Sequence, residues 1–164
     1  MIDSDINTKD LKKNRTYNQI ERCRLDLKKD PSNPLLHVRL GDLYVKWHLD
    51  IYSACQYIDE AITEYQLALE SLIDSHEIYY KIGVAFFHKG ELEKAINYLT
   101  TALEKKNDYY EAYYMLAEAF VKKAHFTDAI DAADTAIKCS PFGSSSAHDL
   151  LHKLYKASSF KNFK

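Results

Sequence analysis

The sequence predicts an all-α fold built from stacked helical hairpins, and three observations predict it. Only 4 Gly and 3 Pro occur in 164 residues, which is few for turn-rich β or α/β folds. The sequence also matches itself at a shift of 34 residues, and self-similarity at such a period is typical of repeat proteins. Finally, apolar residues recur every three or four positions, which is the helical period.

The first expected element is a single helix within residues 1–33, which form an N-terminal tail and capping helix. Four residues share one helical face at spacings of three, three and four: Tyr17, Ile20, Cys23 and Leu27. Residues 30–33 are Asp-Pro-Ser-Asn and follow this helix. We expect the helix to pack on the repeat that comes next.

Two copies of the repeat match closely, over residues 76–109 and 110–143. In each copy, the first helix places a small residue after Leu or Ile, and the second helix places two Ala seven residues apart. The matched positions are Tyr79 and Tyr113, Ile82-Gly83 and Leu116-Ala117, Phe86 and Phe120, Ala95 and Ala129, and Ala102 and Ala136. Small residues permit helices to approach closely, and one hairpin cannot bury its apolar faces alone. Neighbouring hairpins must therefore stack.

A more divergent copy occupies residues 34–75 and contains an 8-residue insertion. It keeps Leu40-Gly41 and Tyr44 in its first helix, whereas His37 replaces the first aromatic residue. An apolar stripe continues without a break from Ile51 to Leu72. This stripe predicts that the insertion lengthens the second helix, with Asp50 as its N-cap.

The overhang created by this insertion has two interpretations. It carries a cluster of apolar side chains: Trp47, Ile51, Tyr52 and Cys55. Either the N-terminal helix covers them, or they form a second contact patch or a self-association surface.

The last expected element is a C-terminal capping helix and tail, over residues 144–164. Its apolar stripe consists of Ala147, Leu150, Leu151 and Leu154, and its opposite face is polar. His148 and His152 lie one turn apart and resemble a zinc-binding His-Glu-x-x-His motif with Asp in place of Glu. A solvated polar face is the favoured interpretation, because no third ligand stands out. We therefore predict no catalytic residue, no metal and no cofactor.

Composition and charge exclude several classes of protein. The net charge of -2 gives no nucleic-acid signal, and no apolar run approaches the length of a membrane span. Three widely spaced Cys are consistent with reduced thiols in the cytoplasm. The charge is uneven, at +3 over residues 1–29, -9 over 30–151 and +4 over 152–164. Solvated helix faces explain this pattern, or else an acidic middle attracts basic partners.

The three copies resemble the tetratricopeptide repeat (TPR) family. Its 34-residue pattern is aromatic, Leu-Gly, aromatic, Ala, aromatic, Ala, Pro, and three copies in register cover about two-thirds of this chain. Pro141 keeps the last position of the pattern, whereas Asn107 and Ile73 replace it in the other copies. The resemblance implies a right-handed α-solenoid without enzymatic activity. It also implies a concave groove, lined by the first helix of each repeat, that binds a peptide or helix of a partner protein.

The register of the family assigns the side chains that would face this groove. They are Arg39, Asp42, Lys46, Tyr80, Lys81, Val84, Phe87, His88, Tyr114, Met115, Glu118 and Lys122. Aromatic and Met residues are common anchors for bound peptides. The alternative is that these large side chains close against the next helix. The capping helix would add His148, His152 and Tyr155.

One ligand class of the family is not expected here. Family members that grip the terminal carboxylate of a chaperone tail use a Lys–Asn pair, an Asn and a Lys–Arg pair. The matching positions hold Val38, Asp42, Lys81, Glu111 and Met115. An internal peptide with apolar and mixed-charge character is the better prediction. We thus expect an adaptor, scaffold or assembly factor; the alternative is a structural unit that forms homo-oligomers through the extended helix of the first repeat.

Overall fold

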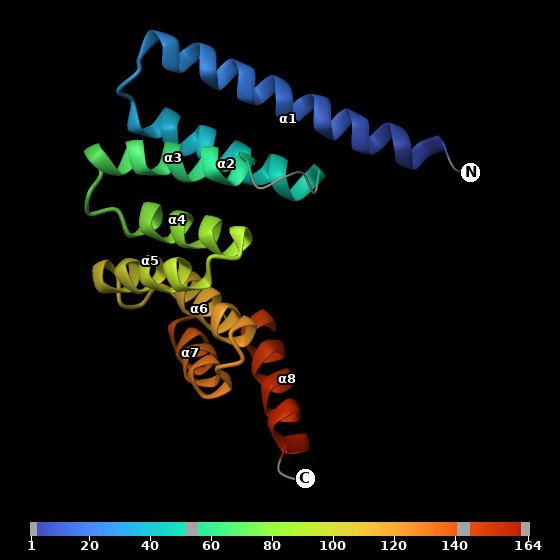
Figure 1. The fold of residues 1–164 in the computed structure, drawn as a ribbon, viewed down its shortest axis with the longest axis vertical. Coiled ribbons are helices and arrows are strands. Elements are labelled where there is room, and N and C mark those ends of the chain that lie inside the picture. Colours follow the sequence, from blue (N-terminus) through green and yellow to red (C-terminus); the bar gives the residue numbers. More distant parts are fainter. Residues whose placement is uncertain (1–2, 52–55, 141–144, 162–164) are drawn as a thin grey trace. The chain divides into compact units, whose positions relative to one another are not determined.

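The computed structural model describes residues 3–51, 56–140 and 145–161, and these ranges contain eight helices and no strand (Figure 1). The all-α prediction is confirmed. The helices are α1 (Asp3–Lys29), α2 (Pro34–Ile51), α3 (Gln56–Ser71), α4 (His76–Lys89), α5 (Leu92–Lys105), α6 (Tyr110–Lys122), α7 (Phe126–Cys139) and α8 (Ser145–Lys161). They form two compact units, an N-terminal unit (Met1–Asp74) and a C-terminal unit (Ser75–Lys164).

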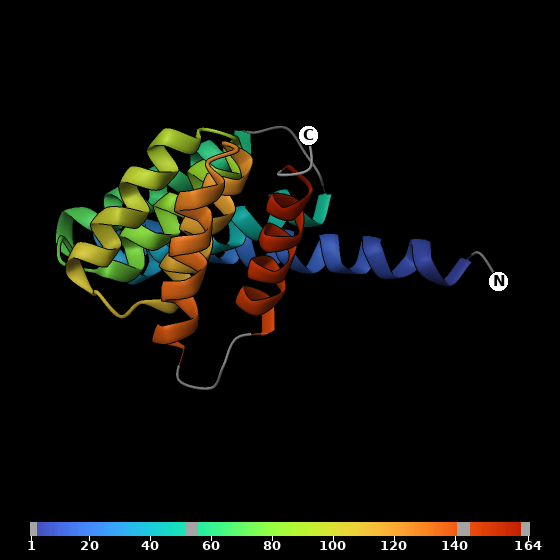
Figure 2. The same cartoon turned by 90° about the horizontal axis from the view of Figure 1, so that it is seen from below.

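The N-terminal unit consists of the α2–α3 hairpin with α1 packed on α2. The beginning of α1 runs on past the end of α2 (Figure 1 and Figure 2). Ile20 and Cys23 of α1 are buried, as their spacing predicts, but Tyr17 is 52% exposed and Thr16 takes the buried position beside it. The α1 helix therefore packs through a narrower apolar stripe than the sequence indicates.

The C-terminal unit contains two hairpins, α4–α5 and α6–α7, followed by α8 packed on α7. Its core combines large side chains such as Leu99, Leu116 and Leu154 with fully buried alanines. Ala95 and Ala102 of α5, and Ala129 and Ala136 of α7, are all completely buried. The seven-residue Ala spacing thus marks helix faces that lie against a neighbouring backbone.

The turns of the two hairpins in this unit repeat the same geometry. Gly90 ends α4 with φ 86°, and its N–H donates to the Phe87 carbonyl at 3.1 Å. Ala124 takes the same place 34 residues later with φ 58°, and its N–H donates to the Val121 carbonyl at 3.0 Å. The left-handed turn is therefore set by the repeat, because the second hairpin forms it without glycine.

The position of the insertion in the first repeat corrects one prediction. The α2 helix continues through Asp50 to Ile51, and α3 begins at Gln56, so Asp50 is not the N-cap of the second helix. The insertion makes α2 18 residues long, against 14 for α4 and 13 for α6. The reason is that Trp47 continues the buried stripe of Leu40 and Tyr44, which holds α2 in the helical state.

The surroundings of Trp47 distinguish the two interpretations of the overhang. This ring is only 8% exposed, and its centroid lies 6.0 Å from that of Tyr17 in α1 and 6.0 Å from that of Tyr57 in α3. The N-terminal helix therefore contributes to its cover. Tyr52 and Cys55 lie outside the described residues, and so does the side chain of Ile51.

Candidate functional site

The predicted partner-binding residues of the N-terminal unit lie on one stripe of α2. Arg39, Asp42 and Lys46 follow each other at spacings of three and four, and all three are exposed. Asp42 accepts a hydrogen bond of 2.7 Å from the Tyr65 hydroxyl, which fixes its carboxylate. This stripe is accessible and carries both signs of charge.

In the C-terminal unit, the predicted binding residues Tyr80 and Tyr114 occupy equivalent, half-buried positions on α4 and α6. The Tyr80 ring meets the Tyr109 ring edge-on at 5.1 Å between centroids. Tyr114 stacks with Tyr110 at 6.3 Å and donates a 3.2 Å hydrogen bond to Glu118. Both side chains pack against the core and are only partly buried there.

Burial and nearby carboxylates keep these hydroxyls protonated. Burial raises the pKa of Tyr80, and the charge of Glu111 raises it further. Burial likewise raises the pKa of Tyr114, and Glu118 adds to the effect. The two side chains therefore act as neutral hydrogen-bond donors with a large apolar surface.

Phe87 differs from the other aromatic residues predicted for the groove. It is only 8% exposed, and the Lys122 ammonium lies 3.9 Å from its ring centroid. The two predicted site residues therefore contact each other, and a ligand reaches the Phe87 ring only after Lys122 moves. The remaining predicted residues on these helices are half-buried: Lys81, Val84, His88 and Met115.

The structure adds residues that the predicted binding set omitted. Tyr109 and Tyr110 lie where the α5–α6 connection enters α6, and both contact predicted binding residues. Glu111 belongs to the same region, because its charge acts on Tyr80 and Tyr109. The sequence carries a signal for Glu111, since a Glu-x-x-Tyr pair occurs at residues 77–80 and again at 111–114.

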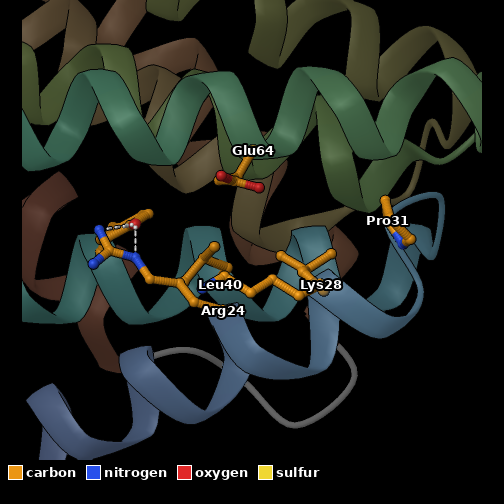
Figure 3. Close-up of a pocket in the computed structure, with 7 residues that line it drawn as sticks. Arg24, Lys28, Pro31, Leu40 and Glu64 are labelled. Atoms are coloured by element: carbon orange, nitrogen blue, oxygen red, sulfur yellow. Dashed lines mark hydrogen bonds between the residues drawn. The ribbon is translucent and has the colours of Figure 1, made fainter.

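A cleft of about 440 Å³ lies in the N-terminal unit, between α1 and α3 (Figure 3). Glu64 of α3 faces Arg24 and Lys28 of α1 across it (Figure 3). Arg24 donates to the Tyr44 hydroxyl at 2.8 and 3.1 Å and to Glu21 at 2.8 Å. The guanidinium is thus engaged within the protein, so this cleft is a weaker candidate than the α4–α6 surface.

His37, which replaces an aromatic residue of the repeat pattern, joins three elements of the N-terminal unit. Its Nδ1 lies 2.6 Å from the Glu64 carboxylate of α3, and its Nε2 lies 2.9 Å from the Pro31 carbonyl before α2. Both partners are acceptors, so the doubly protonated imidazolium satisfies both contacts. The polar substitution is therefore accommodated by a charged bridge.

The histidine pair of α8 lies on an exposed face of that helix. His148 and His152 are both exposed, and the described part of the chain contains no group of three His, Cys, Asp or Glu side chains arranged to hold a metal ion. Cys23 and Cys139 are free thiols. None of the described helices combines the length and the apolar character needed to span a membrane.

Comparison with known proteins identifies the repeats. Tetratricopeptide repeat models match residues 58–109 and 86–154, which together exceed half of the chain. The solved structure of MamA is 24% identical, covers 92% of this chain and 83% of its own, and superposes with a TM-score of 0.74. The Sgt2 TPR domain from Aspergillus fumigatus is 18% identical, with coverages of 80% and 82% and a TM-score of 0.70. No curated protein matches the sequence significantly.

A third similar structure was solved with a ligand. The first TPR of Spaghetti (RPAP3), bound to the HSP90 peptide SRMEEVD, is 18% identical, with coverages of 77% and 93% and a TM-score of 0.67. These likenesses confirm the predicted α-solenoid of helical hairpins. With the two repeat models, they show that the chain belongs to the tetratricopeptide repeat family.

Proposed function

We propose that this protein is a non-catalytic adaptor, scaffold or assembly factor that binds a peptide or helix of a partner protein. The TPR fold supports a protein-interaction module, but a fold alone does not say what is bound, so the mode of binding is inferred from the residues of the site. The main support is the repeated placement of Tyr80 and Tyr114, two half-exposed rings at equivalent positions of α4 and α6. Partly exposed aromatic side chains are suited to anchor a ligand.

The proposed organisation follows the register of the repeats. Residues 1–33 form an N-terminal tail and capping helix, and residues 34–75 form the first repeat with its insertion. Residues 76–109 and 110–143 are the second and third repeats, and residues 144–164 are a capping helix and tail. In this scheme α2, α4 and α6 are the equivalent first helices of the three repeats.

The proposed binding residues extend over those three helices. Arg39, Asp42 and Lys46 on α2 are exposed charges that would set specificity and association rate. Tyr80, Tyr114 and the half-buried Met115 would provide the apolar contacts. A carboxylate clamp is not proposed, because Glu111 occupies a position that binds a carboxylate in clamp-type members of the family.

Paired affinity capture from the native extract tests this function. A Tyr80→Ala/Tyr114→Ala double variant is expected to lose the partner that the wild-type protein retains. Phe87 is left intact because it is buried, and its removal would confuse folding with binding. Leu67→Ala serves as the control, since Leu67 is exposed on the second helix α3. Equal capture by the double variant and the wild type would contradict the proposal.

Self-assembly through the extended first repeat is the second candidate. Leu49, in the extension of α2, is 46% exposed and offers an apolar contact there. In this case the molar mass measured by light scattering would rise with protein concentration, and Leu49→Ser would reduce the rise. A monomer at every concentration would rule this candidate out.

A further inference from the structure

A repeated pair of side chains lies at the start of α4 and of α6. Glu77 and Tyr80 open α4, and Glu111 and Tyr114 take the same positions in α6, 34 residues later. Side chains three residues apart on a helix share one face. On α6 the stripe continues to Glu118, which accepts a hydrogen bond from Tyr114. The Tyr114 ring thus lies between two carboxylates along its helix.

Four tyrosine rings gather at this place, and we call them the tyrosine face: Tyr80, Tyr109, Tyr110 and Tyr114. Tyr80 and Tyr109 are in edge-to-face contact at 5.1 Å, and Tyr110 and Tyr114 are stacked at 6.3 Å. All four are half-buried. The α4 and α6 helices contact each other directly, so the two Glu-Tyr pairs are neighbours.

Several carboxylates surround the tyrosine face. Glu77 and Glu111 are exposed, and neither forms an ion pair with any described residue. Asp149 of α8 also acts on Tyr114, because its charge contributes to the raised pKa of that hydroxyl. The pKa of Tyr109 is raised as well, mainly by burial, with contributions from Tyr80, Glu111 and Glu77. Carboxylates of three helices therefore act on the hydroxyls of the tyrosine face.

Aromatic rings in the same unit already bind cations of the protein itself. Lys94 lies 5.2 Å from the Phe86 centroid, and Lys122 lies 3.9 Å from that of Phe87. On the tyrosine face, Lys106 lies 5.3 Å from the Tyr109 centroid. No cation of a described residue occupies the rings of Tyr80 or Tyr114. These two rings, bordered by carboxylates, can accept a cation from outside.

We propose that the tyrosine face binds a cationic peptide segment, with an arginine side chain of the partner over Tyr80 or Tyr114 and beside the carboxylates of Glu111 and Glu118. This inference rests on the proposed function and specifies the chemistry of the partner. Arginine fits better than lysine, because its planar guanidinium stacks on rings and also pairs with carboxylates through two parallel hydrogen bonds.

The two Glu-Tyr pairs also set a spacing for the ligand. Packed helices lie about 8–10 Å apart, and a polyproline II segment has three residues per turn and rises about 3.1 Å per residue. Two arginines three positions apart in such a segment would therefore lie on one face and reach both pairs. The expected ligand is opposite in charge to an acidic chaperone tail.

Fluorescence anisotropy with a short labelled Gly/Ser peptide carrying two arginines three positions apart tests this inference. The wild-type protein is expected to bind it, more weakly as salt increases, and not to bind the same peptide with two glutamates. Glu111→Gln/Glu118→Gln should lower the affinity at least fivefold. Tyr114→Leu should lower it about threefold to fivefold, with the helical circular dichroism signal unchanged.

Two control variants locate the binding. Glu104→Gln removes an exposed carboxylate from α5 in the same unit, and Asp59→Asn/Glu70→Gln removes two from α3 in the other unit. Both are expected to bind the peptide as the wild type does. The inference is overturned if the arginine peptide does not bind, or if these controls weaken binding as much as Glu111→Gln/Glu118→Gln does.

This test can fail without the proposed function failing. If the captured partner still depends on Tyr80 and Tyr114 while the arginine peptide does not bind, then only the cationic specificity is wrong. If neither the peptide nor the partner depends on these tyrosines, then both proposals are wrong.

Discussion

Gly83, the small residue of α4, allows α4 and α5 to approach so closely that one added carbon atom would not fit between them. A Cβ added at Gly83 would lie 2.8 Å from Leu99 Cγ and 3.2 Å from the Ala95 carbonyl oxygen. Because the second contact is backbone, the helices must separate to relieve it. We expect Gly83→Ala to lower the free energy of unfolding by about 1–3 kcal/mol. Urea unfolding measures the loss, and a stability equal to the wild type would contradict this account of the close approach.

Ala124 offers the opposite test, because it holds a left-handed conformation that glycine adopts more easily. Its φ is 58°, whereas the equivalent Gly90 has φ 86° with open space around its Cα. Ala124→Gly should therefore raise the free energy of unfolding by about 0.5–1 kcal/mol, and Gly90→Ala should lower it by about 1 kcal/mol. Thermal unfolding of the two variants provides a matched comparison, and changes of the same sign would contradict it.

His37 makes the stability of the N-terminal unit depend on pH. Burial lowers its pKa, but hydrogen bonds to Glu64 and the Pro31 carbonyl outweigh burial, so the pKa is raised above its ordinary value. A raised folded-state pKa stabilises the protein fully below about pH 6.5, the unfolded value. This stabilisation is lost as the pH rises through the folded-state pKa. NMR titration of His37 should show the raised pKa, and Glu64→Gln should lower it; an unchanged pKa in that variant would contradict the bridge.

At the scale of a helix, α1 depends on a few buried contacts with its neighbour α2. Ile20 is buried in this contact, and truncating a buried Ile to Ala costs about 2–4 kcal/mol. In repeat proteins the free energy of unfolding comes from each repeat and from its contacts with its immediate neighbours. We therefore expect Ile20→Ala to speed amide hydrogen exchange in α1 while α6 exchanges as in the wild type. Equal acceleration in both helices would show that α1 is not a separate cooperative element.

The helices and their turns are largely predictable from local pattern, and the position of the insertion is not. The Ala pairs of α5 and α7 and the small residue of α4 predict packing faces that the structure confirms. The sequence predicts that the second helix of the first repeat begins at Asp50, because the apolar stripe fits the helical period on both sides of that residue, whereas α2 continues through Asp50. The burial of Trp47 between Tyr17 and Tyr57 decides the question, and such a tertiary contact has no local signal.

At the scale of the whole chain, the repeat register predicts which residues occupy equivalent places but not what each one contacts. It assigns Phe87 to the binding set, and the structure shows Lys122 over its ring. It omits Tyr109, because that residue lies in the connection before α6. In the sequence, the two Glu-Tyr pairs look like ordinary solvated residues. Whether a carboxylate has a basic partner depends on side chains from several helices, which only the structure brings together.

The central claim is that the partner lies along the first helices. It is tested most directly by photo-crosslinking from two positions in the full chain. A crosslinking residue at Val84, half-buried on α4 among the predicted binding residues, is expected to label the captured partner. The same residue at Thr127, exposed on α7, is expected to leave it unlabelled. Labelling from Thr127 with none from Val84 would contradict the claim.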